Sequence, residues 1–394
     1  YKRQVLASPS GGSVAVTPEI HGGLLGGSLG FEQGMLADAQ RGLDTLALGI
    51  AEQFNGRHEL GMNLRGELGG AFFTAVNSPQ LQAERAFAHS GNTGSASLVV
   101  TVDAAGTLRD SDYRLYFDGA QYSLIRQRDD EVLGTFSSLP QSFPNEGFSL
   151  ALAGGTLAAG DSFSIQPSAG TARRIQALVA DAQSIALASP IRTGASLGNL
   201  GDAQISPGRV AALAGTTLGA EITLIYDAGA AAFNLSVPPG GSIPYDPGAD
   251  SGQEVTLNVP GFGDISFALS GEPADNDSFT VAHNAGGVSD NRNALALADL
   301  QGFRFMADGT ATLGESYTRF VADLGSRTRG LEFSGAAQEK ILARAEDARD
   351  AGAGVNLDEE AANLVRYQQA YQASAQLISV SNQLFQTLIG AFGG

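Results

Sequence analysis

An apolar repeat of seven residues near the C-terminus constrains the fold of this chain more than any other sequence feature. Its first row is Leu357, Leu364, Tyr371, Ile378 and Phe385, and its second row is Glu360, Tyr367, Ser374, Ser381 and Leu388. Apolar residues at the first and fourth positions of a heptad are typical of a helix in a left-handed coiled coil. We therefore predict an assembly seam on this helix, formed by Leu357, Leu364, Tyr367, Tyr371, Ile378, Phe385 and Leu388.

The length of this helix raises the question of what covers the seam. At about 1.5 Å per residue, residues 357–392 would form a helix about 54 Å long. No earlier helical pattern in the chain matches that length. One interpretation is a final helix packed on its own domain. The other is a helix that pairs with another subunit or with a missing part of the chain.

A second amphipathic helix is predicted over residues 29–54. Apolar residues recur there at steps of three and four, which places them on one face. They are Leu36, Ala39, Leu43, Leu46, Ile50 and Phe54. Gly42 and Gly49 weaken this helix by about 1 kcal/mol each relative to alanine. Either the two glycines allow close packing against another helix, or they are tolerated defects.

In the middle of the chain the apolar residues alternate, which is typical of β-strands. The Asp-Gly pair at 118–119 separates two alternating runs and predicts a hairpin. The whole pattern then returns, and the Asp-Ser-Phe at 161–163 recurs at 277–279. Any two β-meanders have alternating apolar residues, so alternation alone does not indicate a duplication. The repeated tripeptide favours two copies of one antiparallel unit, at about 96–170 and 207–285.

After residue 288 the helical period returns. Residues 289–293, Ser-Asp-Asn-Arg-Asn, supply types that favour a helix N-cap, and Gly-Ala-Gly at 352–354 interrupts the helical run. The sequence thus predicts a multidomain α plus β protein. An α-helical bundle or coiled-coil base is formed by the chain ends, and two all-β domains, antiparallel sandwiches or barrel-like, are inserted into it.

The predicted segments follow from these changes of period. They are 1–28 (strands and loop of the helical base), 29–80 (helix and loop of the base), 92–195 (first β domain), 196–286 (second β domain, a duplicate of the first), 289–350 (returning helices of the base) and 355–394 (C-terminal coiled-coil helix).

Charge and composition argue against several classes of function. The chain has 23 Lys and Arg against 41 Asp and Glu, a net charge of -18. Nucleic acids and anionic membrane surfaces are bound by basic patches, so we predict neither as a partner. The absence of cysteine excludes disulfides, thiolate metal sites and cysteine nucleophiles. No apolar run approaches the roughly 18 residues of a membrane span, and nothing near Tyr1 resembles a signal peptide.

Motifs that could carry enzyme chemistry have simpler interpretations. The pattern G-x-S-x-G occurs at 26–30 and at 194–198. A nucleophile elbow requires a strand before the serine and a helix after it, and neither site follows a strong apolar strand. Ser28 is interpreted instead as a helix-start residue. We therefore predict that the protein is not an enzyme and has no catalytic residues.

The sequence signals for a metal site are equally weak. The acidic clusters at 110–112, 129–131 and 275–277 lack the ligand spacing of a calcium loop, and Asx-turns between strands account for them. His58 is interpreted as a cation near the C-terminal end of its helix. We predict no metal site and no cofactor-binding site.

Three segments together carry a specific resemblance. They are VNLDEEAANLVRYQQAYQASAQLISVSNQLFQTLI (355–389), SLGFEQGMLADAQRGLDTLALGIAEQFNGRHELGMNLRGELGGAFF (28–73) and SDNRNALALADLQ (289–301). The first resembles the C-terminal signature of the axial proteins of the bacterial flagellum. All three resemble the family of first hook–filament junction proteins within that group. Such proteins begin with a long helical segment that pairs with the C-terminal helix, so the sequence looks like the C-terminal part of a longer protein.

The resemblance implies a structural role in the flagellum. Terminal helices would form the inner core of a tubular assembly, and the β domains would project outward. The implied partners are the hook protein, the second hook–filament junction protein, other copies of the chain, and an export chaperone at the C-terminal helix. The implied location is extracellular, after export through the flagellar channel without a cleaved signal peptide. The alternative function is a secreted β-domain adhesin or binding protein, which would gain nothing from a bare coiled-coil seam.

Overall fold

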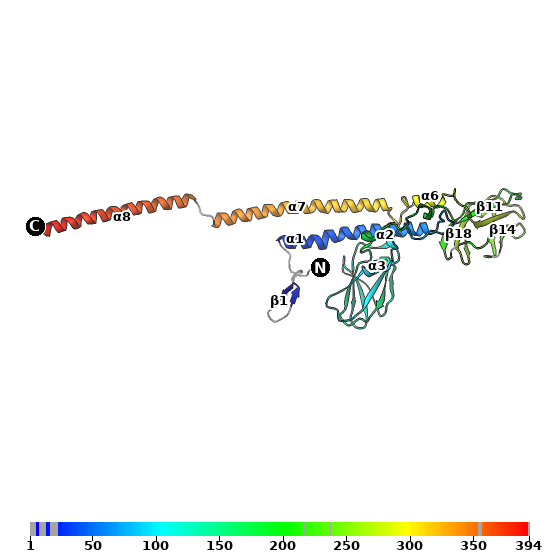
Figure 1. The fold of residues 1–394 in the computed structure, drawn as a ribbon, viewed down its shortest axis with the longest axis horizontal. Helices are drawn as coiled ribbons and strands as arrows, with labels where there is room; N and C mark the ends of the chain where they lie inside the picture. The colour runs from blue at the N-terminus through cyan, green and yellow to red at the C-terminus, as the bar shows by residue number, and fades with distance from the viewer. Residues whose placement is uncertain are drawn as a thin grey trace. The chain divides into compact units, whose positions relative to one another are not determined.

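The computed structural model describes residues 5–7, 13–15, 23–215, 217–236, 238–353 and 357–392. It divides the chain into two compact units, Tyr1–Leu324 and Gly325–Gly394, which are described separately (Figure 1). Helices lie in both terminal regions of the chain, and the region between them consists of antiparallel sheets. The predicted fold class is therefore confirmed.

The N-terminal segment contributes a short antiparallel pair, β1 (Val5–Ala7) with β2 (Ser13–Ala15). Apart from these strands, the part of the predicted segment 1–28 that precedes Gly23 lies outside the described residues.

The helix predicted over 29–54 is longer than expected and is not uniform. It consists of α1 (Gly23–Phe31), a π-helical turn (Glu32–Leu36) and α2 (Ala37–Glu59), which follow one another without a loop. Because α1 begins at Gly23, Ser28 lies inside this helix, and its interpretation as a helix-start residue is wrong.

The two glycines of α2 are packing positions rather than tolerated defects. A Cβ atom on Gly42 would lie 2.6 Å from a ring carbon of Phe320, and one on Gly49 would lie 2.7 Å from the sulfur of Met306. Residues 46–49 of α2 are all buried, whereas Leu36, directly before α2, and Leu43, in its first half, are exposed. The predicted apolar face is therefore covered only in its second half.

The first β domain is a sandwich of two antiparallel sheets. Its strands are β3 (Ala86–Ala88), β4 (Ser97–Val102), β5 (Tyr113–Phe117), β6 (Tyr122–Arg126), β7 (Glu131–Phe136), β8 (Gln141–Phe143), β9 (Phe148–Gly154) and β10 (Ser162–Ile165). One sheet has the order β3-β10-β5-β6-β7 and the other β4-β9-β8. Buried residues of both sheets, among them Leu115 and Phe148, form one core. The predicted hairpin at 118–119 joins β5 to β6.

The second β domain repeats this topology. Its strands are β11 (Ile191–Ala195), β12 (Gln204–Ile205), β13 (Arg209–Leu213), β14 (Ile222–Asp227), β15 (Ala232–Leu235), β16 (Ser242–Pro244), β17 (Glu254–Val259), β18 (Gly263–Ser270) and β19 (Ser278–His283). One sheet has the order β11-β19-β14-β15-β16. In the other, β12 and β13 pair with β18, and β17 also pairs with β18. The five-stranded sheets thus match strand by strand, and the smaller sheet of the second domain has one additional strand.

A loop held by an asparagine and an aspartate occurs once in each β domain, and we call it the Asn–Asp clasp. In the first domain, Asn92 exchanges two hydrogen bonds with the backbone of Ser162, and Asp161 accepts from the N–H groups of residues 93, 94 and 158. In the second domain, Asn199 does the same with Ser278. Asp277 there accepts from the N–H groups of residues 200, 201 and 274. The repeated Asp-Ser-Phe is therefore half of this clasp.

Each sandwich begins and ends on neighbouring strands. At the base of the first, Ala86 of β3 pairs with Ile165 of β10. At the base of the second, Ile191 of β11 pairs with His283 of β19. The chain therefore enters and leaves each sandwich at almost the same point.

Helices return after the second sandwich, as predicted. They are α6 (Arg292–Asp299), α7 (Leu313–Ala353) and α8 (Leu357–Phe392), and short helices occur at α3 (Pro79–Ala83), α4 (Thr171–Arg174) and α5 (Pro247–Asp250). Of the interruption predicted at 352–354, Gly352 and Ala353 are the last residues of α7, and residues 354–356 lie outside the described residues. With 41 residues, α7 is longer than α8 with 36, so the expectation that no earlier helix matches the length of α8 is wrong.

The polar run at 289–293 does more than begin α6. Asn291 takes the N-cap position without a side-chain cap, and Asp290 accepts the hydrogen bond from the N–H of Arg292. The guanidinium of Arg292 donates to the carbonyl oxygens of Pro207, Gly208 and Ile191. These residues therefore join α6 to the base of the second sandwich.

Candidate assembly surface

The seven residues of the predicted seam lie on α8 and are all exposed. Their exposed fractions run from 54% at Leu388 to 80% at Leu357. Successive members of one heptad row shift by only about 20° around a straight helix, so they form a continuous stripe. Within the second unit, neither α8 nor the part of α7 after residue 324 covers the other's apolar residues: Leu331, Phe333, Ile341 and Leu342 of α7 are exposed too.

The exposed apolar surface of α8 is broader than the heptad rows predict. Leu377 and Leu384 each precede a seam residue by one position, and Ile389 follows Leu388. These residues occupy the heptad positions that flank the seam, so the apolar stripe widens toward the C-terminal end of α8. The heptad prediction left them out because it considered only the first and fourth positions of each repeat. A stripe of this width is typical of a helix that contacts more than one neighbour.

The opposite side of α8 is polar. Gln369, Gln376 and Gln383 recur at the heptad position that faces away from the seam, and all three are exposed. Asp358, Glu359 and Glu360 lie in the first turn, where negative charge is favoured by the helix dipole. The helix is therefore amphipathic along its whole length.

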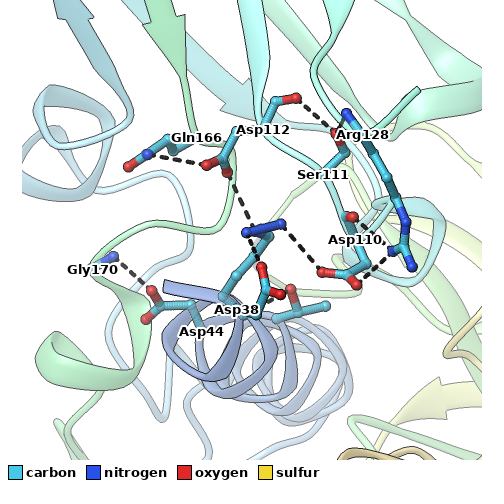
Figure 2. A network of polar contacts seen from close by, with 10 residues as sticks. Asp38, Asp44, Asp110, Ser111, Asp112, Arg128, Gln166 and Gly170 are labelled. Atoms are coloured by element: carbon cyan, nitrogen blue, oxygen red, sulfur yellow. Dashed lines mark hydrogen bonds and ion pairs between the residues drawn. The ribbon is translucent and has the colours of Figure 1, made fainter. Parts of the chain in front are cut away.

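In the first unit, α2 holds the first β domain through a charged contact. The Arg41 guanidinium lies 2.7 Å from Asp38, 3.5 Å from Asp110 and 3.4 Å from Asp112. Figure 2 shows these carboxylates converging, with Arg128 on the far side of Asp110 and Gln166 donating to Asp112. The acidic cluster at 110–112 is thus an ion-pair contact rather than the Asx-turn that we predicted.

Two further carboxylates of α2 accept hydrogen bonds from the backbone of the first β domain and its exit segment. Asp44 accepts from the N–H groups of Gly170 and Ala172, at 3.2 and 2.7 Å (Figure 2). Glu52 accepts from the N–H of Ala105 with both oxygens. Burial raises the pKa values of Asp44, Glu52 and Asp112, and the hydrogen bonds and nearby arginines only partly offset it.

We expect Glu52→Gln to stabilise the protein at pH 7 by about 1 kcal/mol. A carboxyl whose pKa is raised by folding contributes stability that is complete below its unfolded pKa and is lost as pH rises through the folded value. Glutamine keeps one acceptor for Ala105 and removes the buried charge. Urea unfolding at pH 7 and pH 4 should show the gain at pH 7 and almost none at pH 4.

Asp44→Asn is the matched control for this substitution. Asp44 uses its two oxygens for two different N–H donors, so asparagine leaves one donor unpaired and should destabilise the protein. A loss of stability in Glu52→Gln at pH 7 would contradict the assignment.

The end of α2 is fixed by a cluster that we call the Ala186 junction, formed by His58, Gly61, Gly69, Ala186 and Asn293. The Nε2 atom of His58 accepts from the N–H of Ala186 at 2.9 Å, and its Nδ1–H donates to the carbonyl of Gly70 at 2.7 Å. Asn293 donates to the carbonyl of Ala186 at 2.7 Å. His58 is buried, and its two ring nitrogens bond the backbone of Ala186 and Gly70, both outside α2, so its interpretation as a residue capping the end of that helix is wrong.

The G-x-S-x-G motifs do not form nucleophile elbows. Residues 26–30 lie inside α1. Ser196 follows β11, but the next element is the strand β12 rather than a helix, and its hydroxyl accepts from the N–H of Gly198. Ser196 belongs to the loop of the second Asn–Asp clasp, where its counterpart in the first domain is His89.

The remaining acidic clusters also have structural partners. Asp129 accepts from the N–H of Glu131 in an Asx-turn, as predicted, and Asp277 is the clasp aspartate. Within the described residues, no group of three or more histidine, aspartate or glutamate side chains could hold a metal ion. No described helix is both long and apolar enough to cross a membrane.

Comparison with known protein families gives three matches along the chain. Residues 2–73 match the helical domain of flagellar hook-associated protein FlgK, and residues 87–167 match the D2-like domain of flagellar hook-associated protein 1. Residues 349–391 match the C-terminal region of the flagellar basal body rod FlgEFG proteins. The last match contains all seven seam residues.

Individual relatives agree with these matches. Flagellar hook-associated protein 1 of Escherichia coli is 25% identical over 370 residues, 94% of this chain and 49% of the relative. The same protein of Salmonella typhimurium is 24% identical over 371 residues, 94% of this chain and 50% of the relative. This chain thus spans about half the length of these relatives.

A solved structure supports the fold. The flagellar hook junction protein FlgK from Burkholderia pseudomallei is 33% identical to this chain, with a TM-score of 0.72. The similarity covers 85% of this chain and 63% of that structure. The likeness therefore includes most of the helices and sandwiches described above.

Proposed function

Because this chain belongs to the family of flagellar hook-associated protein 1, we propose that it is a structural subunit at the hook–filament junction of the bacterial flagellum. The observation that carries the proposal is the exposed seam of α8. Burial of an apolar side chain of this size contributes about 1.5–3 kcal/mol. Seven such residues in one stripe favour burial against neighbouring helices rather than lasting contact with water.

The proposed partners follow from the same surface. The seam packs against the helices of other copies, of the hook protein and of the second junction protein, and an export chaperone covers it before assembly. The subunit is extracellular after export through the flagellar channel without a cleaved signal peptide, and its role is not enzymatic. The β sandwiches project outward. An adhesin, the alternative function, would have no use for the α8 stripe.

The test replaces three seam residues, Tyr371, Ile378 and Phe385, with serine in the bacterium that makes the protein. We expect the variant to be lost from purified hook–basal bodies and the cells to be non-motile, because about 5–9 kcal/mol of burial is removed from each subunit. Thermal melting of the purified chain should not change, since these side chains are exposed.

The matched control replaces Gln369, Gln376 and Gln383 with serine on the polar side of the same helix. This variant should enter the junction and support motility. Normal motility and normal junctions in the seam variant would overturn the proposed function.

A further inference from the structure

Most edge strands of the two sandwiches are protected against pairing with another chain. Unpaired backbone N–H and C=O groups along an edge can receive a further strand, and proteins usually block them. Among the described strands, the pairing of β7 and of β13 contains a bulge, β11 lies against β12, and β16 is only three residues long and ends in Pro244. On β4, Asn77 bonds the N–H and the carbonyl of Val102, and Arg85 donates to the carbonyl of Val100.

Strand β17 is the exception. It is six residues long and pairs with β18 without a bulge from Glu254 to Val259. No described strand pairs with its other edge, and no other described helix or strand packs extensively against it. Within the described residues, the backbone groups of 254–258 make no backbone hydrogen bonds outside the ladder with β18. We call this side of the strand the free edge of β17.

The first sandwich supplies an internal comparison. Its counterpart of β17 is β8, where Ser142 lies opposite Ser149 as Thr256 lies opposite Ser266 in the second sandwich. Strand β8 is only three residues long and runs directly into a 3-10 turn at Pro144–Glu146. Since one sandwich folds with so short a strand at this place, the topology does not require an edge of the length of β17.

The two faces of β17 define which side chains an added strand would carry. On one face, Val255 and Leu257 are half-buried and pack against the core of the sandwich, so an added strand would carry apolar residues there. On the other face, the exposed Asn258 donates to Asp264 at 2.6 Å. Residues 191–285 contain two arginines against ten aspartates and glutamates, so this face favours basic residues in the added strand.

We propose that the free edge of β17 binds an extended segment of another protein in which basic and apolar residues alternate. Main-chain hydrogen bonds give affinity to such a complex, and alternate side chains give it specificity. One of the two arginines of this sandwich, Arg209, is already paired with Glu254 and does not offset the remaining acidic charge. A second copy of the chain is a poor occupant, because each copy carries a net charge of -18. This inference does not depend on the proposed function.

The test uses the purified chain and a fluorescent peptide of eight residues in which lysine and valine alternate. We expect saturable binding in fluorescence anisotropy at low ionic strength. The same peptide with methylated backbone amides keeps its charge but cannot donate hydrogen bonds to the edge. A peptide with glutamate in place of lysine keeps the amides but is repelled. Both should bind at least tenfold more weakly.

A variant of the chain locates the site. Thr256→Lys places a positive charge in the middle of the free edge, and we expect it to weaken binding of the lysine–valine peptide at least tenfold. The matched control is Ser142→Lys on β8, which should bind as the native chain does. Both positions are exposed, and thermal melting of the two variants would verify that they fold.

The outcomes that would overturn the proposal are specific. They are no binding by the native chain, equal binding of the methylated peptide, or an equal loss of binding in the two lysine variants. Self-association of the native chain that Thr256→Lys removes would also overturn it, because the occupant would then be a second copy. The comparison of the three peptides needs no variant, so it decides the question even where Thr256→Lys fails to fold.

Discussion

Replacing Gly69 with alanine is expected to lower the free energy of unfolding of the first unit by about 3 kcal/mol. The new Cβ atom would overlap the carbonyl oxygen of His58 and lie 2.8 Å from the Cβ of Ala186. Both neighbours belong to the Ala186 junction, where His58 and Asn293 bind the Ala186 backbone from two sides. The backbone must shift to admit a methyl group, and such overpacking typically costs 1–3 kcal/mol or more. Urea unfolding followed by circular dichroism would measure it.

The adjacent glycine is the control. A Cβ on Gly70 would meet nothing within 4 Å, and its backbone does not require a positive φ. Gly70→Ala should therefore leave the free energy of unfolding almost unchanged. Equal stability of the two variants would show that the junction is looser than its distances indicate.

Replacing Glu146 with alanine should destabilise the first sandwich by about 3 kcal/mol. Glu146 is 4% exposed, accepts a 2.6 Å hydrogen bond from the hydroxyl of Tyr113, and pairs with Arg126. Burial and the nearby carboxylate raise the pKa of Tyr113, so the phenol stays a donor across the working range of pH. Removing one partner of a buried ion pair leaves the other charge uncompensated, at a typical cost of 3–5 kcal/mol. Arg126 also pairs with Asp129 and Glu131, so its charge keeps partners in the variant, and we expect a loss of stability at the lower end of this range.

Tyr113→Phe tests whether the three groups act together. This variant keeps the pair of Glu146 with Arg126 and should cost only about 1 kcal/mol. In the double variant the two losses should not add, because both remove the same hydrogen bond. Strict additivity in urea unfolding would contradict a shared network.

The parts of the fold that were predictable from sequence are those with a local period. The heptads ending at Phe385 and Leu388 predict α8, and alternation predicts the hairpin of β5 and β6. The repeated Asp-Ser-Phe indicates two related β units because the clasp needs the same residues in both. The tetrapeptides at 91–94 and 198–201, both Gly-Asn-x-Gly, are a second signal of the clasp that the analysis of strand pattern missed.

The contacts that escaped sequence analysis join residues far apart in the chain. His58 meets Ala186, and Arg41 meets Asp110 and Asp112, across separations that no periodicity encodes. The same holds for the role of Arg292 at the base of the second sandwich. For the candidate assembly surface, the heptad pattern predicted the centre of the apolar stripe on α8 but not its width. Leu377 and Leu384, which widen the stripe, lie outside the first and fourth heptad positions.

The paired ends of the two sandwiches have a consequence for how such a chain changes over time. Since Ala86 lies beside Ile165, and Ile191 beside His283, the points at which the chain enters and leaves each sandwich lie one strand spacing apart, about 4.8 Å. A different domain whose ends meet at that spacing would fit the path of the chain, provided that it also covers the side chains of α2 and α6 that contact the sandwiches, such as Leu48 and Arg292. Diversity in the sandwiches and constancy in the helices are thus compatible in one polypeptide.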